Sequence, residues 1–360
     1  MKAFSNLSNY IAWRGDLSFT QAPFCEVDNL ILSVLIYHRF SLITGKKPIT
    51  LKHAFELYAM LPETTRFLGT LVPQNLPQFA KESASCRRFS EVLLANFTDT
   101  LDETRQMQFA AGTYLLPDGS IFVAFRGTDD TLVGWKEDLN MSFASPIPSQ
   151  LQAVRYLETA AARYPNAQIR VGGHSKGGNL AQYAAIHASA EIQRRILAAY
   201  SNDGPGFEKT VPQQKGYIAI RERLHTLIPQ SSVVGMFLTY NENYRTVSSK
   251  QNGIFQHDPM SWEVIGDHFI TLPHRSPFGK RADRAIKDWL EAVPPQKQKD
   301  AFEALYRSFL ATNAKTVTDL KERRYQTLLA LMNSMNKIDK ATAKEFAKLF
   351  RTVFLQFPQK

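Results

Sequence analysis

The sequence contains only two cysteines, Cys25 and Cys86, among 360 residues. This number excludes a framework of several disulfides, and we interpret both side chains as buried small apolar groups. No apolar run approaches the roughly 18 residues that a membrane-spanning helix requires. The N-terminal residues also lack the apolar core of a secretory signal. Together these absences favour a protein that works in the cytoplasm.

Several other signals are missing from the sequence. Its His, Cys and acidic residues nowhere show the spacing of a known metal site. There is no internal repeat, no low-complexity tract and no nucleic-acid-binding motif. We therefore expect no metal, no cofactor and no nucleic-acid partner.

The composition is that of an ordinary globular protein, with 44% hydrophobic and 21% charged residues. The net charge of +10 is unevenly placed. Residues 275–360 hold 18 Lys and Arg against 9 Asp and Glu, whereas the preceding residues are almost neutral. We interpret the basic end first as a solvated helix face. The alternative is a weak contact between its basic helices and an anionic membrane surface.

The pattern of apolar residues divides the chain into three parts. Residues 1–100 are predicted to be a mainly helical segment that packs on a core. Residues 101–275 show a hairpin and then short strands that alternate with helices, which implies a mostly parallel sheet with both faces covered. Residues 276–360 return to helices with apolar stripes and form a basic C-terminal extension. The expected strands of the core lie at 111–116, 121–125, 168–171, 196–201 and 224–228.

The most informative motif is Gly-x-Ser-x-Gly at residues 173–177. It follows an apolar strand and precedes a helix-forming segment, which is the strand–turn–helix pattern of a nucleophile elbow. Gly173 and Gly177 have no Cβ, so the backbones of the strand and the helix can approach closely. The motif predicts an α/β-hydrolase fold in which Ser175 is the nucleophile.

A serine hydroxyl becomes an effective nucleophile when a base, usually histidine, takes its proton. Because the chain order in this fold is serine, acid, histidine, the base is expected downstream, at His257, His268 or His274. We predict His257, since it lies in a polar loop that contains a proline. His174 adjoins the nucleophile, but successive side chains diverge at such a turn, so we expect it to be structural.

The oxyanion of an acyl-transfer intermediate needs converging donors. One is the backbone N–H of the residue after the nucleophile, here Lys176. The second is expected from the loop after strand 121–125, where Gly127 lets the backbone turn towards the site. We predict Thr128 as this donor, with help from its hydroxyl, and Asp138 as a support of the loop.

The acid is the least determined member of the predicted triad. Asp203 follows strand 196–201, where a carboxylate can reach the histidine, although Asn, Asp, Gly and Pro also form turns there. Asp258 is a poorer candidate, because neighbouring side chains rarely orient each other. The sequence leaves two arrangements open: a triad with Asp203, or a Ser–His dyad oriented by a neutral group.

Three groups of residues resemble fungal-type (class 3) lipases. They are Phe125-Arg-Gly-Thr with Trp135 and Asp138, the Gly-His-Ser of residues 173–175, and Gln256-His257 with Trp262. Further motifs resemble a bacterial family of unknown function within the same hydrolase group: Trp13-Arg-Gly-Asp, Ser175-Lys-Gly-Gly-Asn, Asp203-Gly-Pro-Gly-Phe and Ser232-Val-Val-Gly-Met. This resemblance covers roughly residues 8–270 and implies the hydrolysis of a carboxylic ester. Class 3 lipases carry their acid after the strand that here is 224–228, but this chain has Ser232 there, and Asp203 instead resembles the acid of pancreatic-type lipases.

These observations predict a serine hydrolase that cleaves a small-molecule or lipid ester through an acyl-enzyme on Ser175. Two other functions fit the same residues. One is a non-catalytic binding protein with a hydrolase fold, which the missing acid after strand 224–228 favours. The other is an acyltransferase that uses Ser175 and His257 but excludes water. The sequence leaves open whether residues 276–360 form a lid or a partner-binding surface.

Overall fold

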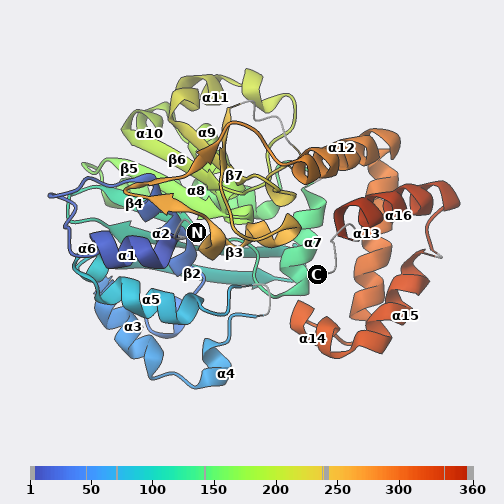
Figure 1. The fold of residues 1–360 in the computed structure, drawn as a ribbon, viewed down its shortest axis with the longest axis horizontal. Coiled ribbons are helices and arrows are strands. Elements are labelled where there is room, and N and C mark those ends of the chain that lie inside the picture. The colour runs from blue at the N-terminus through green and yellow to red at the C-terminus, as the bar shows by residue number, and fades with distance from the viewer. Residues whose placement is uncertain are drawn as a thin grey trace.

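The computed structural model describes residues 5–45, 47–69, 72–141, 143–236, 238, 243–335 and 337–354. Within these residues the central sheet has nine strands in the order β1-β2-β3-β4-β5-β6-β7-β8-β11 (Figure 1). Its strands are β1 (Ile49–Thr50), β2 (Leu93–Asp102), β3 (Met107–Leu115), β4 (Ile121–Phe125), β5 (Ile169–His174), β6 (Ile196–Asn202), β7 (Leu224–Pro229), β8 (Tyr244–Val247) and β11 (Thr271–Leu272). A small separate ribbon pairs β9 (Val264–Ile265) with β10 (His268–Phe269).

Five neighbouring strands of the sheet, β4 to β8, run parallel, whereas the pairs at both ends of the sheet are antiparallel. The strand β4 shows why both faces must be covered, because all five of its side chains are buried. Phe122 and Ala124 pack with the N-terminal helices, while Ile121, Val123 and Phe125 join the cluster on the opposite face. The predicted α/β-hydrolase fold with a mostly parallel sheet is therefore confirmed.

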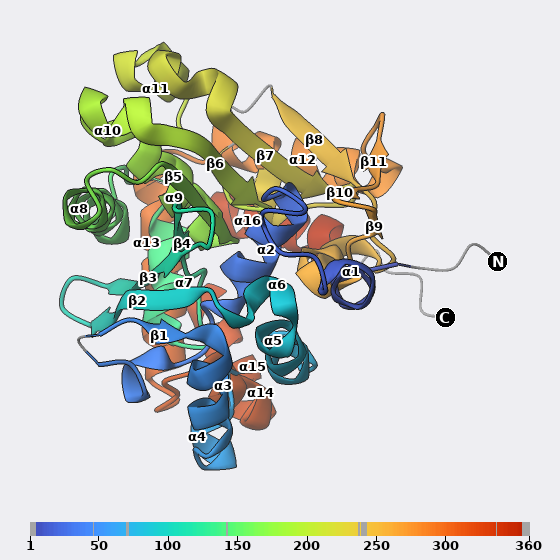
Figure 2. The same ribbon diagram turned by 90° about the vertical axis from the view of Figure 1, so that its left-hand side faces the viewer.

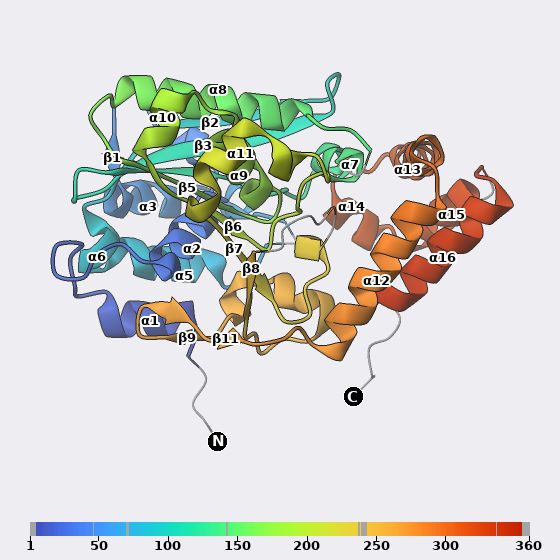
Figure 3. The same cartoon turned by 90° about the horizontal axis from the view of Figure 1, so that it is seen from above.

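Helices lie on both faces of the sheet (Figure 3). One face is covered by α2, beyond which α3 and α5 pack against each other, and the other face by α8 and α9 (Figure 2). The N-terminal helices are α1 (Leu7–Arg14), α2 (Glu26–Leu35), α3 (Leu51–Ala59), α4 (Glu63–Arg66), α5 (Leu76–Ser85) and α6 (Arg87–Ser90). The helices between the strands are α7 (Leu132–Asn140), α8 (Pro148–Arg163), α9 (Lys176–His187), α10 (Ala190–Arg195) and α11 (Lys215–Ile220).

The C-terminal helices lie next to α7, on the right in Figure 1. They are α12 (Pro277–Ala292), α13 (Pro295–Leu310), α14 (Val317–Glu322), α15 (Arg324–Met335) and α16 (Lys340–Phe354). Within this group α12 packs on α16 and α13 on α15, and α13 also contacts α7. None of the helices in the described ranges combines the length and hydropathy that crossing a bilayer would need.

The structure differs from the sequence-based expectations at the start of the sheet and at the two cysteines. The sheet begins inside the segment 1–100 that was expected to be mainly helical, since β1 and most of β2 lie there. The two cysteines are half-buried rather than buried, and neither forms a disulfide. Each instead has a polar neighbour: the Cys25 Sγ lies 3.3 Å from the Tyr10 hydroxyl, and the Cys86 Sγ donates to the Ser83 carbonyl.

Candidate active site

The turn between β5 and α9 carries Ser175 in a strained conformation, with φ 59° and ψ −135°. Such backbone angles cost of order 1–3 kcal/mol in a residue with a Cβ and persist only where the surroundings enforce them. Here the enforcement is close packing, because a Cβ on Gly177 would overlap the Phe125 carbonyl oxygen at the end of β4. The turn therefore has the geometry of the predicted elbow and raises the Ser175 hydroxyl above the carboxyl ends of the parallel strands.

Asp203 and His257 meet beside this turn. Asp203 follows β6 in the left-handed region, with φ 52°, and its side chain is fully buried. His257 ends a short 3₁₀ turn, Gly253–His257, after β8. The His257 Nδ1–H donates to Asp203 Oδ2 at 2.6 Å. This contact fixes the ring and leaves Nε2 as the nitrogen that can act on a serine proton.

Ser175 and His257 line the same cavity. Within the described residues no hydrogen bond yet joins the Ser175 hydroxyl to His257. Such contacts are often long in ligand-free sites and shorten when substrate binds. His268 and His274, the other downstream candidates, lie elsewhere: His268 is exposed beside Asp267, and His274 lines a separate hollow next to β8 and α12.

Ser232, which follows β7, completes the surroundings of the buried carboxylate. Its hydroxyl donates a short hydrogen bond to Asp203 Oδ1, and the backbone N–H of Gly235 donates to the same oxygen at 3.2 Å. These two donors hold Oδ1, so that Oδ2 faces His257. In the sequence, Ser232 stands out only as the residue where the acid of class 3 lipases is missing. Its position after the strand next to β6 was the signal that would have identified it as a neighbour of Asp203.

The loop between β4 and α7 lies against the elbow. A Cβ on Gly127 would come within 3.1 Å of the Ser175 Cβ. The backbone N–H groups of Thr128 and Lys176 donate to no protein acceptor within the described residues, so both are available to an oxyanion at this position. The assignment of these two N–H groups as a pair of oxyanion donors stays a prediction.

The Thr128 hydroxyl has a different role from the one expected. It donates to Asp138 Oδ2 at 2.5 Å, so it is turned to this carboxylate and not to the oxyanion position. Burial raises the pKa of Asp138 to about 6, against the opposing effects of Lys176 and of the Thr128 hydrogen bond. Asp138 thus supports the loop from the cavity side and changes its protonation in mildly acidic solution.

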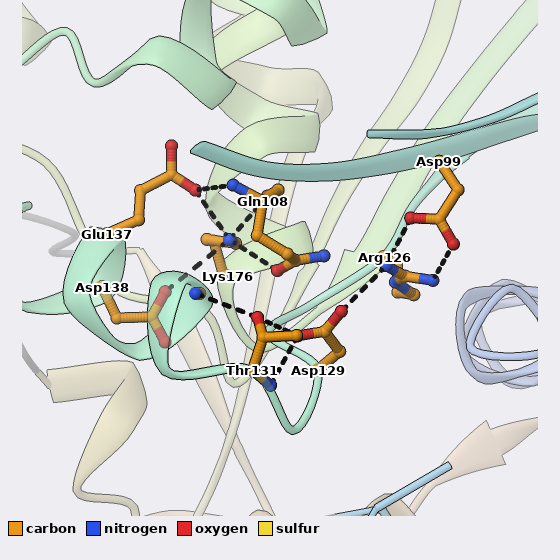
Figure 4. Close-up of polar contacts among 9 residues, drawn as sticks. Asp99, Gln108, Arg126, Asp129, Thr131, Glu137, Asp138 and Lys176 are labelled. Carbon is orange, nitrogen blue, oxygen red and sulfur yellow. Dashed lines mark hydrogen bonds and ion pairs between the residues drawn. The ribbon is translucent and has the colours of Figure 1, made fainter. Parts of the chain in front are cut away.

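The side chain of Lys176 is buried between β3 and α7 (Figure 4). Its ammonium group donates to the Gln108 carbonyl and to Gln108 Oε1, both at 2.8 Å, and to Glu137 Oε2 at 2.9 Å. Glu137 in turn accepts from the backbone N–H groups of Gln108 and Ser149. A buried ion pair of this kind needs such additional hydrogen bonds to offset its desolvation. The sequence predicted only the backbone role of Lys176 and missed this one.

His174, the last residue of β5, supports the base. Its Nε2 lies 2.8 Å from the His257 carbonyl, and its Nδ1 lies 3.2 Å from the Tyr37 hydroxyl. Since a carbonyl only accepts, Nε2 carries the proton and Nδ1 accepts from Tyr37. Burial, followed by the proximity of His257, lowers the pKa of His174 well below its usual value, so the ring stays neutral. The structural role expected for His174 is thus to hold the backbone of His257.

The cavity above Ser175 has a volume of about 210 Å³. This is smaller than the roughly 300–1,000 Å³ of most small-molecule sites. The N-terminal segment supplies much of its apolar wall, and the rim includes Trp135, which is 40% exposed. Its apolar lining consists of Val34, Val72, Pro73, Leu76, Trp135, Val234 and Pro259. Among the residues that the structure describes, no group of three or more His, Cys, Asp or Glu side chains is placed to hold a metal ion.

Comparisons with known proteins identify a family and several similar solved structures. The model of the Mbeg1-like family matches residues 83–307, which is more than half of the chain. Among solved structures, the chain is similar to the lipase from Rhizopus microsporus var. chinensis, with 14% identity and a TM-score of 0.39 over 67% of this chain and 77% of that chain. It is also similar to a fungal lipase in an inhibitor complex, with 15% identity and a TM-score of 0.38 over 70% of this chain and 89% of that chain.

The Lip2 lipase from Yarrowia lipolytica is a third similar structure, with 14% identity and a TM-score of 0.33 over 52% of this chain and 74% of that chain. No curated protein matches the sequence. These identities and TM-scores are low, so the fold and the chemistry rest on the geometry of this chain's own residues.

Proposed function

Since the chain belongs to the Mbeg1-like family, we propose that it is a serine hydrolase that cleaves a carboxylic ester or an acyl-lipid. The observation that supports this most strongly is the contact between Asp203 and His257 beside a serine on a strained elbow. In this proposal Ser175 is the nucleophile, His257 the general base and Asp203 the acid that orients it. The backbone N–H groups of Thr128 and Lys176 form the oxyanion hole.

The reaction has two halves. The Ser175 oxygen attacks the ester carbonyl carbon while its proton passes to His257 Nε2, and the carbonyl oxygen becomes an oxyanion held by the two N–H groups. Asp203 stabilises the imidazolium. When the carbon–oxygen bond to the alcohol breaks, His257 gives its proton to the departing oxygen and an acyl-enzyme remains. Water then attacks the acyl group, its proton passing through His257 back to Ser175.

The cavity suggests which part of a substrate lies at the elbow. Its apolar wall suits an acyl chain, and its small volume favours a short one. We therefore propose that esters of short acids are turned over faster than esters of long ones. A panel of esters that differ only in acyl length tests this, and a rate that rises steadily with chain length would contradict it.

Covalent labelling tests the reaction itself. A fluorophosphonate should add one phosphonyl group to the wild-type protein, on Ser175, and none to Ser175→Ala. Asp203→Asn should keep the fold but lower kcat by about 10⁴-fold, because the histidine loses its correct tautomer and orientation. If the intact mass of the folded wild-type protein stayed unchanged after treatment with the fluorophosphonate, the proposal would be wrong.

Two alternatives from the sequence are separated by simple measurements. The non-catalytic binding protein drew its support from the missing acid after β7, and the contact of Asp203 with His257 weakens that support. An acyltransferase would use the same residues but pass the acyl group to an alcohol. Product analysis with added alcohols distinguishes it from a hydrolase, because a hydrolase releases mainly the free acid.

We further propose that the C-terminal helices contact an anionic membrane surface. Tyr325, Leu329 and Met332 on α15 are 74%, 42% and 57% exposed, and their spacing places them on one face of the helix. Residues 275–360 also carry the positive surplus. The full chain should sediment with anionic vesicles more than with neutral ones, and Leu329→Ser should reduce that binding. Equal sedimentation with both kinds of vesicle would contradict the contact.

A further inference from the structure

The oxyanion loop is joined to the C-terminal helices by backbone hydrogen bonds. Just after Thr128, the Leu132 N–H donates to the Lys315 carbonyl at 2.9 Å, and the Val317 N–H donates to the Asp130 carbonyl at 2.8 Å. Between these bonds Thr131 pairs with Thr316 in an antiparallel bridge. The segment that precedes α14 therefore lies along the loop and pairs with it through one isolated bridge.

Side chains of α7 extend this junction. Lys136 is fully buried, and its Nζ contacts Glu303 Oε1 of α13 at 2.8 Å and Asn140 Oδ1 at 2.9 Å. The next residue, Glu137, turns to the other side and binds Lys176 in the first turn of α9. The helix that follows the oxyanion loop is thus held by an ion pair to the elbow on one side and by an ion pair to the C-terminal helices on the other.

Apolar contacts also join the start of α7 to the C-terminal helices. Leu132, the first residue of α7, forms a buried cluster with three residues of the C-terminal part, which are Ala314, Val317 and Leu320. Upstream of Thr128 the loop is fixed by Arg126, whose guanidinium makes two hydrogen bonds of 2.8 Å to Asp99 (Figure 4). Thr128 lies between this anchor and the junction with residues 315–317.

We propose that the segment 314–320 is a positioning element of the active site, which holds the oxyanion loop so that the Thr128 N–H faces the nucleophile. This inference rests on the proposed hydrolase function for its consequence in catalysis. In this proposal the C-terminal helices are neither a lid nor only a docking surface, because they hold the loop that carries the Thr128 N–H. Weakening the junction should lower kcat more than it raises KM, since an oxyanion donor acts mainly in the transition state.

Val317→Pro is a specific test. Val317 is the first residue of α14, where proline is well tolerated, and Thr316 before it already has the extended backbone that proline requires, with φ −129° and ψ 162°. The substitution removes the N–H that binds Asp130 and also replaces the buried Val317 side chain in the cluster with Leu132, so both changes weaken the junction. Lys340→Pro is the control, because it also places a proline at the first residue of a C-terminal helix, here the exposed first residue of α16, outside the junction of residues 314–320 with the oxyanion loop.

We expect Val317→Pro to lower kcat for a short ester by about tenfold to a hundredfold, with KM changed by about twofold or less. Lys340→Pro should retain the wild-type values. Glu303→Gln, which leaves the buried Lys136 without its carboxylate, should lower kcat in the same direction and provides a second variant if Val317→Pro does not fold. Equal kcat values for Val317→Pro and Lys340→Pro would overturn the proposal.

Hydrogen exchange separates failure of this inference from failure of the proposed function. If the wild type neither labels nor turns over esters, the hydrolase proposal fails, but the junction is still measured by the exchange of residues 126–132. Faster exchange there in Val317→Pro, but not in Lys340→Pro, supports the positioning element. Unchanged exchange in both variants refutes it.

Discussion

The two helical flanks of the sheet are attached to it in different ways. The N-terminal flank, helices α1 to α6, shares one continuous core with the sheet, in which Leu30 and Phe40 pack in the same cluster as Phe122. The C-terminal flank, helices α12 to α16, has separate small clusters, of which one contains Trp289 and Phe302. The first flank is therefore part of the folding unit of the sheet, whereas the second has a core of its own and reaches the site through α7.

The charged groups of the flanks differ in the same way. In the N-terminal flank, Arg88 and Asp28 form an ion pair in which both side chains have no exposed surface. In the C-terminal flank, pairs such as Lys297 with Asp339 are about half exposed on both sides, and such pairs contribute little to stability. Substitutions in the first flank should therefore act on the whole fold, while those in the second should act locally.

The largest expected effect is that of Arg88→Met. The variant would leave the Asp28 carboxylate buried without its partner, and the carbonyls of Leu17, Ala22 and Pro23 would lose their donor. Breaking a buried pair in this way costs about 3–5 kcal/mol, and the unfolding transition of the whole sheet should shift by that amount. Urea unfolding followed by far-UV circular dichroism measures it.

Arg307→Met in the C-terminal flank is the control for that substitution. Arg307 is 78% exposed, and its nitrogen lies 3.8 Å from the Glu303 carboxylate. Its loss should change the free energy of unfolding by about 0.5 kcal/mol or less. If the two variants had similar stabilities, the contrast between the flanks would not hold.

How much of the fold could be predicted depends on whether an element carries a local pattern of its own in the sequence. The elbow, the hairpin of β3 and β4, and the strands β5 to β7 were predicted because each is marked by a local pattern of apolar residues, glycines and turns. The four-residue β8 and the two-residue β11 were not predicted, since such short strands carry no periodicity of their own. They depend on the neighbouring strand for their pairing.

The candidate site shows the same limit. Ser175, His257 and Asp203 could be proposed from motifs and from chain order, but the contact between Ser232 and Asp203 depends on two neighbouring strand ends. The junction of the oxyanion loop with α14 is still less visible in the sequence, because Asp130 and Thr318 are 188 positions apart. A pattern within a window of residues holds no information on such a pairing.

Trp289→Ala should destabilise the C-terminal flank without destabilising the sheet. Trp289 is 1% exposed and packs on Phe302 with ring centroids 5.4 Å apart. Removing a buried tryptophan costs about 3–5 kcal/mol. Here the loss falls on the C-terminal flank and on Leu139 and Phe143, which pack against its cluster. We expect hydrogen-exchange protection to fall over 277–354, with the strands of the sheet still protected.

Phe40→Ala is the counterpart in the N-terminal flank. Its side chain has no exposed surface and belongs to the core that includes the sheet. This variant should lower protection in the strands as well as in its own helices. A uniform loss of protection over the whole chain in both variants would show that the two flanks unfold as one unit.

The smallest expected effect is a difference between the flanks in how their stability depends on pH. His38 of the N-terminal flank has no exposed surface, and burial lowers its pKa from 6.5 to about 4, although the hydrogen bond to the Leu35 carbonyl opposes this. Between pH 6.5 and about pH 4, His38 therefore binds a proton in the unfolded chain but stays neutral in the folded chain. The stability that comes from neutral His38 is fully present above pH 6.5 and is lost as the pH falls towards 4. The full difference corresponds to at most about 3 kcal/mol.

His38→Leu should remove this part of the acid sensitivity, so that its stability relative to the wild type rises as the pH falls from 7 to 4.5. Urea midpoints at several pH values in this range measure the difference. Residues 275–360 contain no histidine, and the pKa values of Asp319 and Asp339 there are lowered by hydrogen bonds, so these two carboxyl groups gain protons only below this range. Parallel stability curves for His38→Leu and the wild type would mean that the N-terminal flank does not hold His38 neutral, and the proposed difference in acid sensitivity would then need another origin.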